Sequence, residues 1–246
     1  MLVPKVIALE GCDGVGKTAY TTQFKNFFEK NGKSVACSHT PAKDLPIGEL
    51  ARLTLSPDKG EEAWEKARTL GFSNKEELFL ASIIEVAEYL CTLRNTFKYD
   101  VYLLDRWWPS HLAYDQELTR LSPTEIFCLI KKMLDLQEKS SILKENKNFS
   151  KRLFLPHLLY VDFPSPQENK ELYDKILENR MKDKTKGTVS IYDEDLPFQF
   201  RVRNNYRKLM NVLNMHKDQI RALDNYPFYR ADTIYPYTKE LPVHLF

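Results

Sequence analysis

The sequence predicts an α/β fold in which a five-stranded parallel sheet carries helices on both faces. Short apolar segments typical of buried parallel strands recur along the chain, and they alternate with longer segments of helical periodicity. The predicted strands are Val6–Glu10, Lys33–Ser38, Asp100–Asp105, His157–Asp162 and, on a weaker pattern, Gln219–Asp224. The predicted helices are Lys17–Lys30, Lys75–Phe97, Glu168–Lys182 and Phe198–Met215.

Length and local signals complete this outline. A chain of 246 residues with 43% hydrophobic content can bury one sizeable core, so we expect residues 1–246 to form a single domain. A further helix should begin at Ser122, because Ser122 can cap it, Pro123 suits its first turn and Glu125 can close a capping box. The run Glu138–Lys151 is rich in lysine and asparagine and lacks apolar periodicity, which predicts a solvated loop or helix tail.

Charge and cysteine content exclude several classes of protein. The formal net charge is only +2, so nothing in the overall charge favours a nucleic-acid polymer or a membrane surface as partner. Four widely spaced cysteines without a C-x-x-C pair argue against a zinc site and a disulfide framework, and they fit the reducing cytoplasm. The apolar segment Val3–Leu9 lacks the features of a signal peptide and is predicted to be the first strand.

A phosphate-binding motif follows the first predicted strand. Residues 11–18, GCDGVGKT, match G-x-x-x-x-G-K-[ST] directly before a predicted helix, where a glycine turn with an incidental lysine is the alternative. In this motif backbone N–H groups surround phosphate oxygens, Lys17 pairs with the β- and γ-phosphates, and the Thr18 hydroxyl holds Mg²⁺. We therefore expect ATP and Mg²⁺ as ligands. The expected contacts of ATP in this loop are Gly11, Asp13, Gly14, Val15, Gly16, Lys17 and Thr18.

A second candidate site lies at the end of the third predicted strand, at Asp105-Arg106. Ligands of open α/β sheets gather at such strand ends. Asp105 can bind Mg²⁺, and Arg106 can hold an anionic acceptor with its planar fork. The alternative is a structural ion pair beneath Trp107 and Trp108, but a phosphate-binding loop in the same sheet favours the site.

Together, the phosphate-binding loop, the pair Asp105-Arg106 followed by Ser110, Ala113 and Tyr114, and a basic segment near Arg180 resemble the thymidylate kinase family. The resemblance spans most of the chain in the family's order. It implies a P-loop NTPase fold and a cytoplasmic phosphotransferase that moves the γ-phosphate of ATP onto a nucleoside monophosphate, with dTMP as the first acceptor. It also suggests a homodimer formed through helices that flank the sheet.

The resemblance assigns roles to individual positions. Asp13 would contact the acceptor sugar, Arg106 the acceptor phosphate and Tyr114 the acceptor. The segment with Pro41, Lys43, Gly48-Glu49 and Arg52 would contact the acceptor nucleotide.

A lid is also implied, over residues Arg180–Arg203. Positions 12–15 of the loop supply no cation, so Arg180 is the expected catalytic cation, with Lys184 beside ATP.

The chain departs from the family where the acceptor base should bind. Leu80 and Ile84 stand where the family has an aromatic residue and an arginine, and Phe79 restores an aromatic ring if the register shifts by one. The acceptor base therefore stays open, with dCMP, dUMP and dGMP as alternatives to dTMP. Candidate replacements for the missing base contact are Glu85, Glu88 and Gln116. Trp107-Trp108 either stacks on the acceptor or belongs to the core.

Two other functions fit the same motifs. A deoxynucleoside kinase would need a carboxylate beside the attacking hydroxyl, for which Glu10 or Asp105 is available. A regulator that binds a nucleotide without transferring phosphate would also fit, because the base-contact arginine is missing.

Overall fold

The computed structural model describes residues 4–56, 58–115, 118, 120–162, 164–184, 196–223 and 230–234. Within these residues one sheet runs in the order β2-β3-β1-β4-β5, and every neighbouring pair is parallel. This arrangement confirms the predicted α/β fold with a five-stranded parallel sheet. The strands are β1 (Lys5–Glu10), β2 (Val35–His39), β3 (Val101–Asp105), β4 (His157–Val161) and β5 (Ala231–Ile234).

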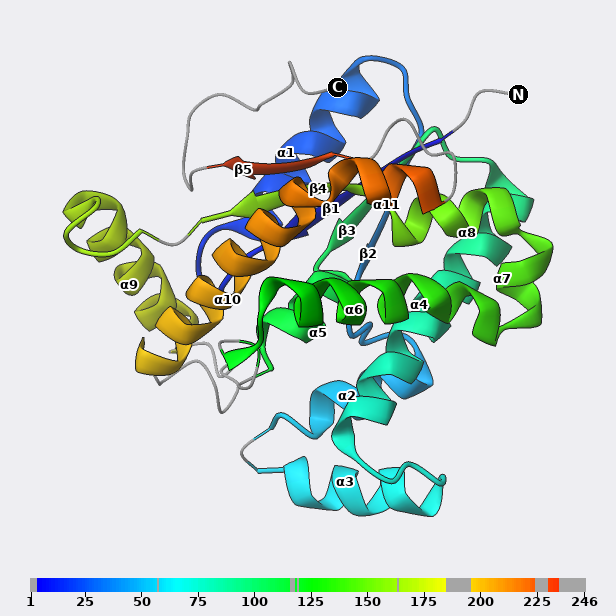
Figure 1. Ribbon diagram of the computed structural model, residues 1–246, viewed down its shortest axis with the longest axis horizontal. Coiled ribbons are helices and arrows are strands. Elements are labelled where there is room, and N and C mark those ends of the chain that lie inside the picture. Colours follow the sequence, from blue (N-terminus) through cyan, green and yellow to red (C-terminus); the bar gives the residue numbers. More distant parts are fainter. Residues whose placement is uncertain are drawn as a thin grey trace.

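Helices cover the sheet, with α1 against β1, β2 and β3, α8 against β1 and α10 against β5. Figure 1 shows α3 at the bottom of the view, farthest from the sheet. The predicted limits of α1 and α4 agree with the structure. The helices are α1 (Lys17–Lys30), α2 (Pro46–Leu53), α3 (Gly60–Thr69), α4 (Lys75–Phe97), α5 (Trp108–Ala113), α6 (Pro123–Leu134), the 3₁₀ helix η2 (Asp135–Lys139), α7 (Ser141–Glu145), α8 (Lys147–Phe154), α9 (Lys170–Lys184), α10 (Leu196–Met215) and α11 (Lys217–Leu223).

The predicted start of α6 is confirmed, because Ser122 and Glu125 form the complete capping box and Pro123 opens the helix. The fifth strand was predicted in the wrong place. Most of Gln219–Asp224 belongs to α11, where Ile220 is fully buried, and Asp224 lies outside the described residues. The apolar Ile220 between the polar residues Gln219 and Arg221 suits a short helix that lies on a core, whereas a buried parallel strand is a continuous apolar run. The strand that pairs with β4 is Ala231–Ile234.

The prediction of a solvated segment at Glu138–Lys151 was also wrong. The segment forms the end of η2, all of α7 and much of α8, and it buries Leu143 and Phe149. Within Glu138–Lys151 the buried apolar side chains are Leu143 and Phe149, six positions apart, so no helical period extends through the segment.

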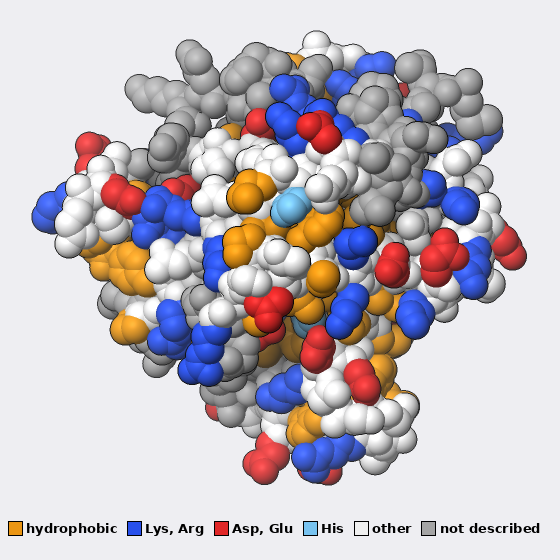
Figure 2. Space-filling model, viewed as in Figure 1, with side chains coloured by type: hydrophobic (Ala, Val, Ile, Leu, Met, Phe, Trp, Pro, Cys, Tyr) orange, Lys and Arg blue, Asp and Glu red, His pale blue; other side chains and the backbone are white. Residues whose placement is uncertain are grey.

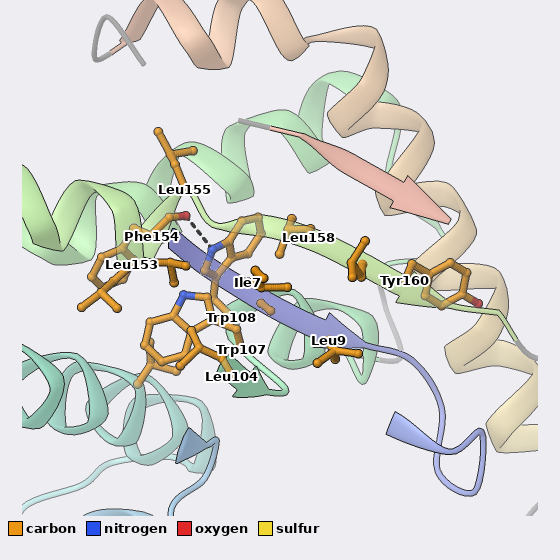
Figure 3. Packing of buried hydrophobic residues seen from close by; sticks show 14 of the residues in the cluster. Ile7, Leu9, Leu104, Trp107, Trp108, Leu153, Phe154, Leu155, Leu158 and Tyr160 are labelled. Atoms are coloured by element: carbon orange, nitrogen blue, oxygen red, sulfur yellow. Dashed lines mark hydrogen bonds between the residues drawn. The ribbon is translucent and has the colours of Figure 1, made fainter. Parts of the chain in front are cut away.

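Trp107 and Trp108 belong to the hydrophobic core, since both side chains are 0% exposed. Figure 3 shows them beside β1 and the end of α8, where Trp108 Nε1 donates a hydrogen bond to the Phe154 carbonyl at 2.9 Å. Phe154 also lies against Trp107, with 5.8 Å between ring centroids. Of the two alternatives for this pair, the core is correct, and neither ring is available to stack on an acceptor.

The surface has no dominant charge on the face drawn in Figure 2, where acidic and basic side chains are interspersed. Among the described helices, none combines the length and the apolar character that crossing a bilayer requires.

Candidate functional site

The loop between β1 and α1 has the backbone of a phosphate cradle. Gly11, Gly14 and Gly16 have positive φ angles of 143°, 79° and 89°. Residues that carry a Cβ atom rarely adopt this conformation. A Cβ atom at Gly11 would lie 2.5 Å from the carbonyl oxygen of Val161, so β4 also requires glycine there. Gly16 is the N-cap of α1, and the loop therefore delivers its amides at a helix N-terminus, where anions bind.

Lys17 lies in this loop with only 7% of its surface exposed. Its Nζ donates a hydrogen bond to the Cys12 carbonyl at 2.6 Å. Burial, and then the positive charge of Arg106, lower the pKa of Lys17, while the carboxylates of Asp13 and Asp105 oppose the shift. A buried cation in this position is a strong partner for a polyphosphate.

Thr18 and Asp105 meet at the carboxyl ends of β1 and β3. The sheet pairs Leu9 with Asp105 in register, which brings the end of β3 beside the start of α1. The Thr18 hydroxyl donates a hydrogen bond to Asp105 Oδ2 at 2.8 Å. These two hard oxygen ligands are close enough to bind one cation, and oxygen donors are the ligands that Mg²⁺ prefers.

Arg106 follows Asp105 in a left-handed conformation, with φ of 67°. Its Nη2 forms an ion pair with Asp13 and donates a hydrogen bond to the Tyr114 hydroxyl at 3.1 Å. Tyr114 in turn donates to Asp13 Oδ2 at 2.8 Å, and the guanidinium lies 5.1 Å from the centroid of the Tyr114 ring. The structure therefore brings three predicted site residues, from the loop, from directly after β3 and from the C-cap of α5, into one hydrogen-bonded triangle.

Behind Arg106 lies a buried carboxylate whose contacts were not apparent in the sequence. Glu10, 1% exposed, accepts hydrogen bonds from the Trp107 backbone N–H at 2.7 Å, the Ser110 hydroxyl at 2.6 Å and the Tyr206 hydroxyl at 3.1 Å. Burial raises the pKa of Glu10 to about 7, although the Ser110 hydrogen bond and the charge of Arg106 oppose the shift. The sequence could indicate Glu10, because an acidic residue at the end of an apolar strand is a candidate site residue. It gave no indication of Tyr206, which lies in the middle of a helix.

The segment after β2 carries three predicted acceptor residues. Pro41 follows a cis peptide bond, and the preceding Thr40 donates its N–H to the Asp105 carbonyl at 3.2 Å, so this segment begins beside the end of β3. Lys43 and Arg52 are exposed, Arg52 being on α2.

Glu85 on α4 caps the start of α2. Its carboxylate accepts the backbone N–H groups of Ile47 and Gly48 at 3.0 and 2.8 Å. A Cβ atom at Gly48 would lie 2.3 Å from the Ala42 carbonyl oxygen, which shows how closely α2 approaches this segment. Each oxygen of Glu85 thus accepts one backbone N–H, and its suggested contact with the acceptor base stays a prediction. Gln116, another candidate, lies outside the described residues.

An aromatic pair joins α4 to α5. The rings of Phe79 and His111 stack with 6.3 Å between centroids and 27° between planes. Burial lowers the pKa of His111, opposed by Glu76 and Asp115, so the ring is neutral at physiological pH. Leu80, the predicted base contact, is partly buried on α4. Sequence reasoning missed His111, although it lies directly after Ser110 and three residues before Tyr114.

The predicted lid is only partly described. The backbone of Arg180 and Lys184 forms the last turns of α9, but their side chains and residues 185–195 lie outside the described residues. At the other end, residues 198–203 form the first turns of α10, as expected from the predicted helix Phe198–Met215, and the extent of the lid stays a prediction. Gln199 is fully buried and accepts the Asp13 N–H at 3.4 Å, and Arg203 is 6% exposed in ion pairs with Glu168 and Asp162.

Known proteins similar to this chain point to one family. The thymidylate kinase family model, described as "Thymidylate kinase", matches residues 9–143, more than half of the chain. A "Probable thymidylate kinase" of Methanosphaera stadtmanae is 28% identical over 185 residues, which cover 72% of this chain and 82% of that protein. The structure of thymidylate kinase from Candida albicans is similar, with a TM-score of 0.50 and 16% identity over 94% of this chain and 83% of that one. The chain has the P-loop NTPase fold and belongs to the thymidylate kinase family of phosphotransferases.

Proposed function

We propose that the chain is a nucleoside monophosphate kinase that transfers the γ-phosphate of ATP to a deoxynucleoside monophosphate, with dTMP as the first acceptor and ADP and dTDP as products. Family membership supports this proposal. The single observation that carries it is the meeting of Lys17 and Thr18 with Asp105 and Arg106 at the carboxyl ends of β1 and β3. That arrangement would present Lys17 and Thr18 to a triphosphate and Arg106 to an anionic acceptor.

In the proposed reaction an oxygen of the acceptor phosphate attacks the γ-phosphorus of ATP. The bond from this phosphorus to the oxygen bridging the β-phosphate breaks, and ADP leaves with the electron pair. The attacking oxygen is already ionised at neutral pH, so no general base is required. The loop amides and Lys17 would stabilise charge on the β- and γ-phosphates, and Arg106 would hold and orient the acceptor phosphate. Arg180 from the lid is the proposed further cation, with Lys184 beside ATP.

Thr18 and Asp105 are the proposed magnesium ligands. Bound Mg²⁺ would neutralise the β- and γ-phosphate oxygens during transfer. Among the described residues no group of three or more His, Cys, Asp or Glu side chains is placed to hold a metal ion unaided. This fits Mg²⁺, which commonly binds through one or two protein oxygens together with phosphates and water.

The acceptor would lie between the triangle of Asp13, Arg106 and Tyr114 and the aromatic pair of Phe79 and His111. Tyr114 and His111 are both supplied by the segment that forms α5, so the two groups are neighbours. Pro41, Lys43, Arg52 and Leu80 are the remaining proposed contacts.

A deoxynucleoside kinase is less well supported. A hydroxyl acceptor needs a carboxylate free to take its proton. Glu10 is buried and already accepts three hydrogen bonds, and Asp105 accepts the Thr18 hydroxyl. We therefore favour a phosphate as the acceptor. A cytoplasmic location and a homodimer remain proposals based on the family.

The proposal is tested by measuring ADP production with ATP, Mg²⁺ and each common nucleoside or nucleoside monophosphate. We expect turnover that depends on a monophosphate and is highest with dTMP. Turnover with nucleosides alone would instead identify a deoxynucleoside kinase. Tight ATP binding without any turnover that depends on an acceptor would identify a regulator.

A further inference from the structure

Glu10 is a buried carboxylate beside the phosphate-binding loop. Its carboxylate lies at the end of β1, immediately before a loop that binds anions, and its charge repels the negative ligands expected there. Its surface is 1% exposed, and burial raises its pKa to about 7. Burying a carboxylate is costly, so its presence calls for a role that a neutral side chain cannot fill.

The hydrogen-bond partners of Glu10 all lie beside Arg106. One carboxylate oxygen accepts the N–H of Trp107, the residue after Arg106, at 2.7 Å. Arg106 itself donates its N–H to Leu9, the residue before Glu10, at 2.9 Å. The end of β1 therefore holds the backbone on both sides of the left-handed Arg106, a conformation that a residue other than glycine adopts only under constraint.

The second carboxylate oxygen fixes two hydroxyl groups beside the guanidinium. Ser110 and Tyr206 both donate to Glu10 Oε2, and their oxygens lie 2.7 Å from each other. Arg106 Nη1 then donates to these oxygens at 3.4 and 3.5 Å. The three contacts among Ser110, Tyr206 and Glu10 share two hydroxyl protons, and an ionised carboxylate, which can only accept, draws these protons away from the guanidinium.

Building on the proposed function, we propose that Glu10 is a positioning residue that acts through Arg106. Its carboxylate holds the turn at Arg106 and orients Ser110 and Tyr206 so that the guanidinium is set for the acceptor phosphate. Glu10 itself touches neither nucleotide. Its titratable neighbours are Arg106 after β3 and Tyr206 on α10, and Tyr160 of β4 stacks on Tyr206 at 5.1 Å. Burial raises the pKa values of both tyrosines, so Arg106 provides the charge that acts on Glu10.

The first test is Glu10→Gln, which keeps the shape and removes the charge. We expect kcat/KM for dTMP at about pH 8 to fall roughly ten- to a hundredfold while KM for ATP stays within about twofold. The ratio of wild-type to variant kcat/KM should rise through the pKa of Glu10 and decline toward one over roughly two pH units below it. Because the acceptor phosphate titrates equally with both enzymes, its ionisation cancels from this ratio.

Stability gives an independent readout. A pKa raised in the folded state means that wild-type stability is highest below the unfolded pKa of Glu10 and is lost as pH rises through about 7. The Tm of Glu10→Gln relative to wild type should therefore rise with pH while acceptor kinetics worsen. A variant whose Tm falls at every pH, with equal losses for both substrates, would show a purely structural residue and overturn the proposal.

Tyr206→Phe provides the second variant and has a matched control. It removes one hydroxyl from the network. It should lower kcat/KM for dTMP, as Glu10→Gln does, but by a smaller factor. Tyr102→Phe makes the same change in a fully buried tyrosine that packs against Phe149 at 4.7 Å, and it should leave kinetics unchanged.

Calorimetric binding of dTMP, which needs no turnover, separates this inference from the proposed function. Wild-type protein that binds no nucleoside monophosphate would overturn both. Wild-type protein that transfers phosphate to dTMP, with Glu10→Gln matching it in Kd and kcat, would overturn the positioning role alone.

Discussion

The Thr18 hydroxyl donates a hydrogen bond to Asp105 Oδ2 at 2.8 Å and so joins the start of α1 to the end of β3. The parallel pairing of β1 with β3, with Leu9 opposite Asp105, produces this contact between residues far apart in sequence. Any cation bound by both oxygens would lie at the mouth of the phosphate loop. The contact therefore links the phosphate-binding loop to the end of β3, which is followed by the proposed acceptor residue Arg106.

Thr18→Val tests the proposed magnesium site. The change keeps the side-chain shape and removes one oxygen ligand, so the Mg²⁺ concentration for half-maximal activity should rise about tenfold. Activity is measured against Mg²⁺ concentration at saturating ATP. The control is Thr22→Val, one turn later on α1, whose hydroxyl donates a hydrogen bond to the Thr18 carbonyl at 3.0 Å and which should not change the Mg²⁺ response. An unchanged Mg²⁺ response for Thr18→Val would remove Thr18 from the metal site.

Lys17→Ala should lower kcat by about a thousandfold, because the loop loses the cation aimed at the transferred phosphate. The fold should persist, since burial lowers the pKa of Lys17 and its charge therefore does not favour folding. Steady-state kinetics and a thermal melt measure the two effects. Lys25→Ala on the exposed side of the same helix, where Lys25 pairs with Glu29, should behave as wild type. Retained turnover in Lys17→Ala would refute the phosphate-cradle interpretation.

Arg106→Ala should raise KM for the acceptor and lower kcat together, because the arginine would hold and orient the acceptor phosphate. Arg106→Lys should restore little, since lysine lacks the planar fork that donates to Asp13, Gly11 and Tyr114. Kinetics with varied dTMP at fixed ATP measure both variants. An acceptor response identical to wild type would place Arg106 outside the acceptor site.

Much of the fold and of the candidate site could be predicted from the sequence, because it depends on local sequence patterns. The strands β1, β3 and β4 are continuous apolar runs, and the loop at residues 11–18 and the pair Asp105-Arg106 follow two of them. Parallel strands place their carboxyl ends at one edge of the sheet, so the juxtaposition followed from the fold.

The features that could not be predicted from the sequence depend on tertiary contacts or on weak local patterns. The bond from Tyr206 to Glu10 joins residues almost at opposite ends of the chain, and nothing in the residues around Tyr206 signals it. The strand β5 has only four residues and one buried side chain, too short a pattern to compete with the helical α11. The helices α2 and α3 bury their apolar residues in a separate cluster with α4, which the sequence did not indicate.

Glu168 predicts how stability depends on acidity. Hydrogen bonds from Arg207 and the Ser165 backbone lower the pKa of Glu168 from 4.5 to about 2 in the folded protein. A lowered folded pKa gives stability that is complete above the unfolded value and is lost as pH falls through the folded one. The Tm advantage of wild type over Glu168→Gln should therefore be largest above about pH 5 and shrink toward pH 2. Glu171→Gln, at an exposed position nearby, is the control, and an advantage independent of pH would contradict the assignment.

The stack of Phe79 on His111 predicts where the acceptor base binds. Phe79→Leu keeps an apolar side chain but removes the ring, so KM for dTMP should rise about fivefold, which corresponds to about 1 kcal/mol of lost aromatic contact. KM for ATP should not change, because Phe79 and His111 belong to the proposed acceptor site and not to the phosphate-binding loop. The matched control is Phe97→Leu at the far end of the same helix, where the ring is 62% exposed. Kinetics with dTMP, dCMP, dUMP and dGMP then show whether this pair selects the base. An equal loss for all four would mean that the ring supports the pocket without reading the base, and no loss at all would place the base elsewhere.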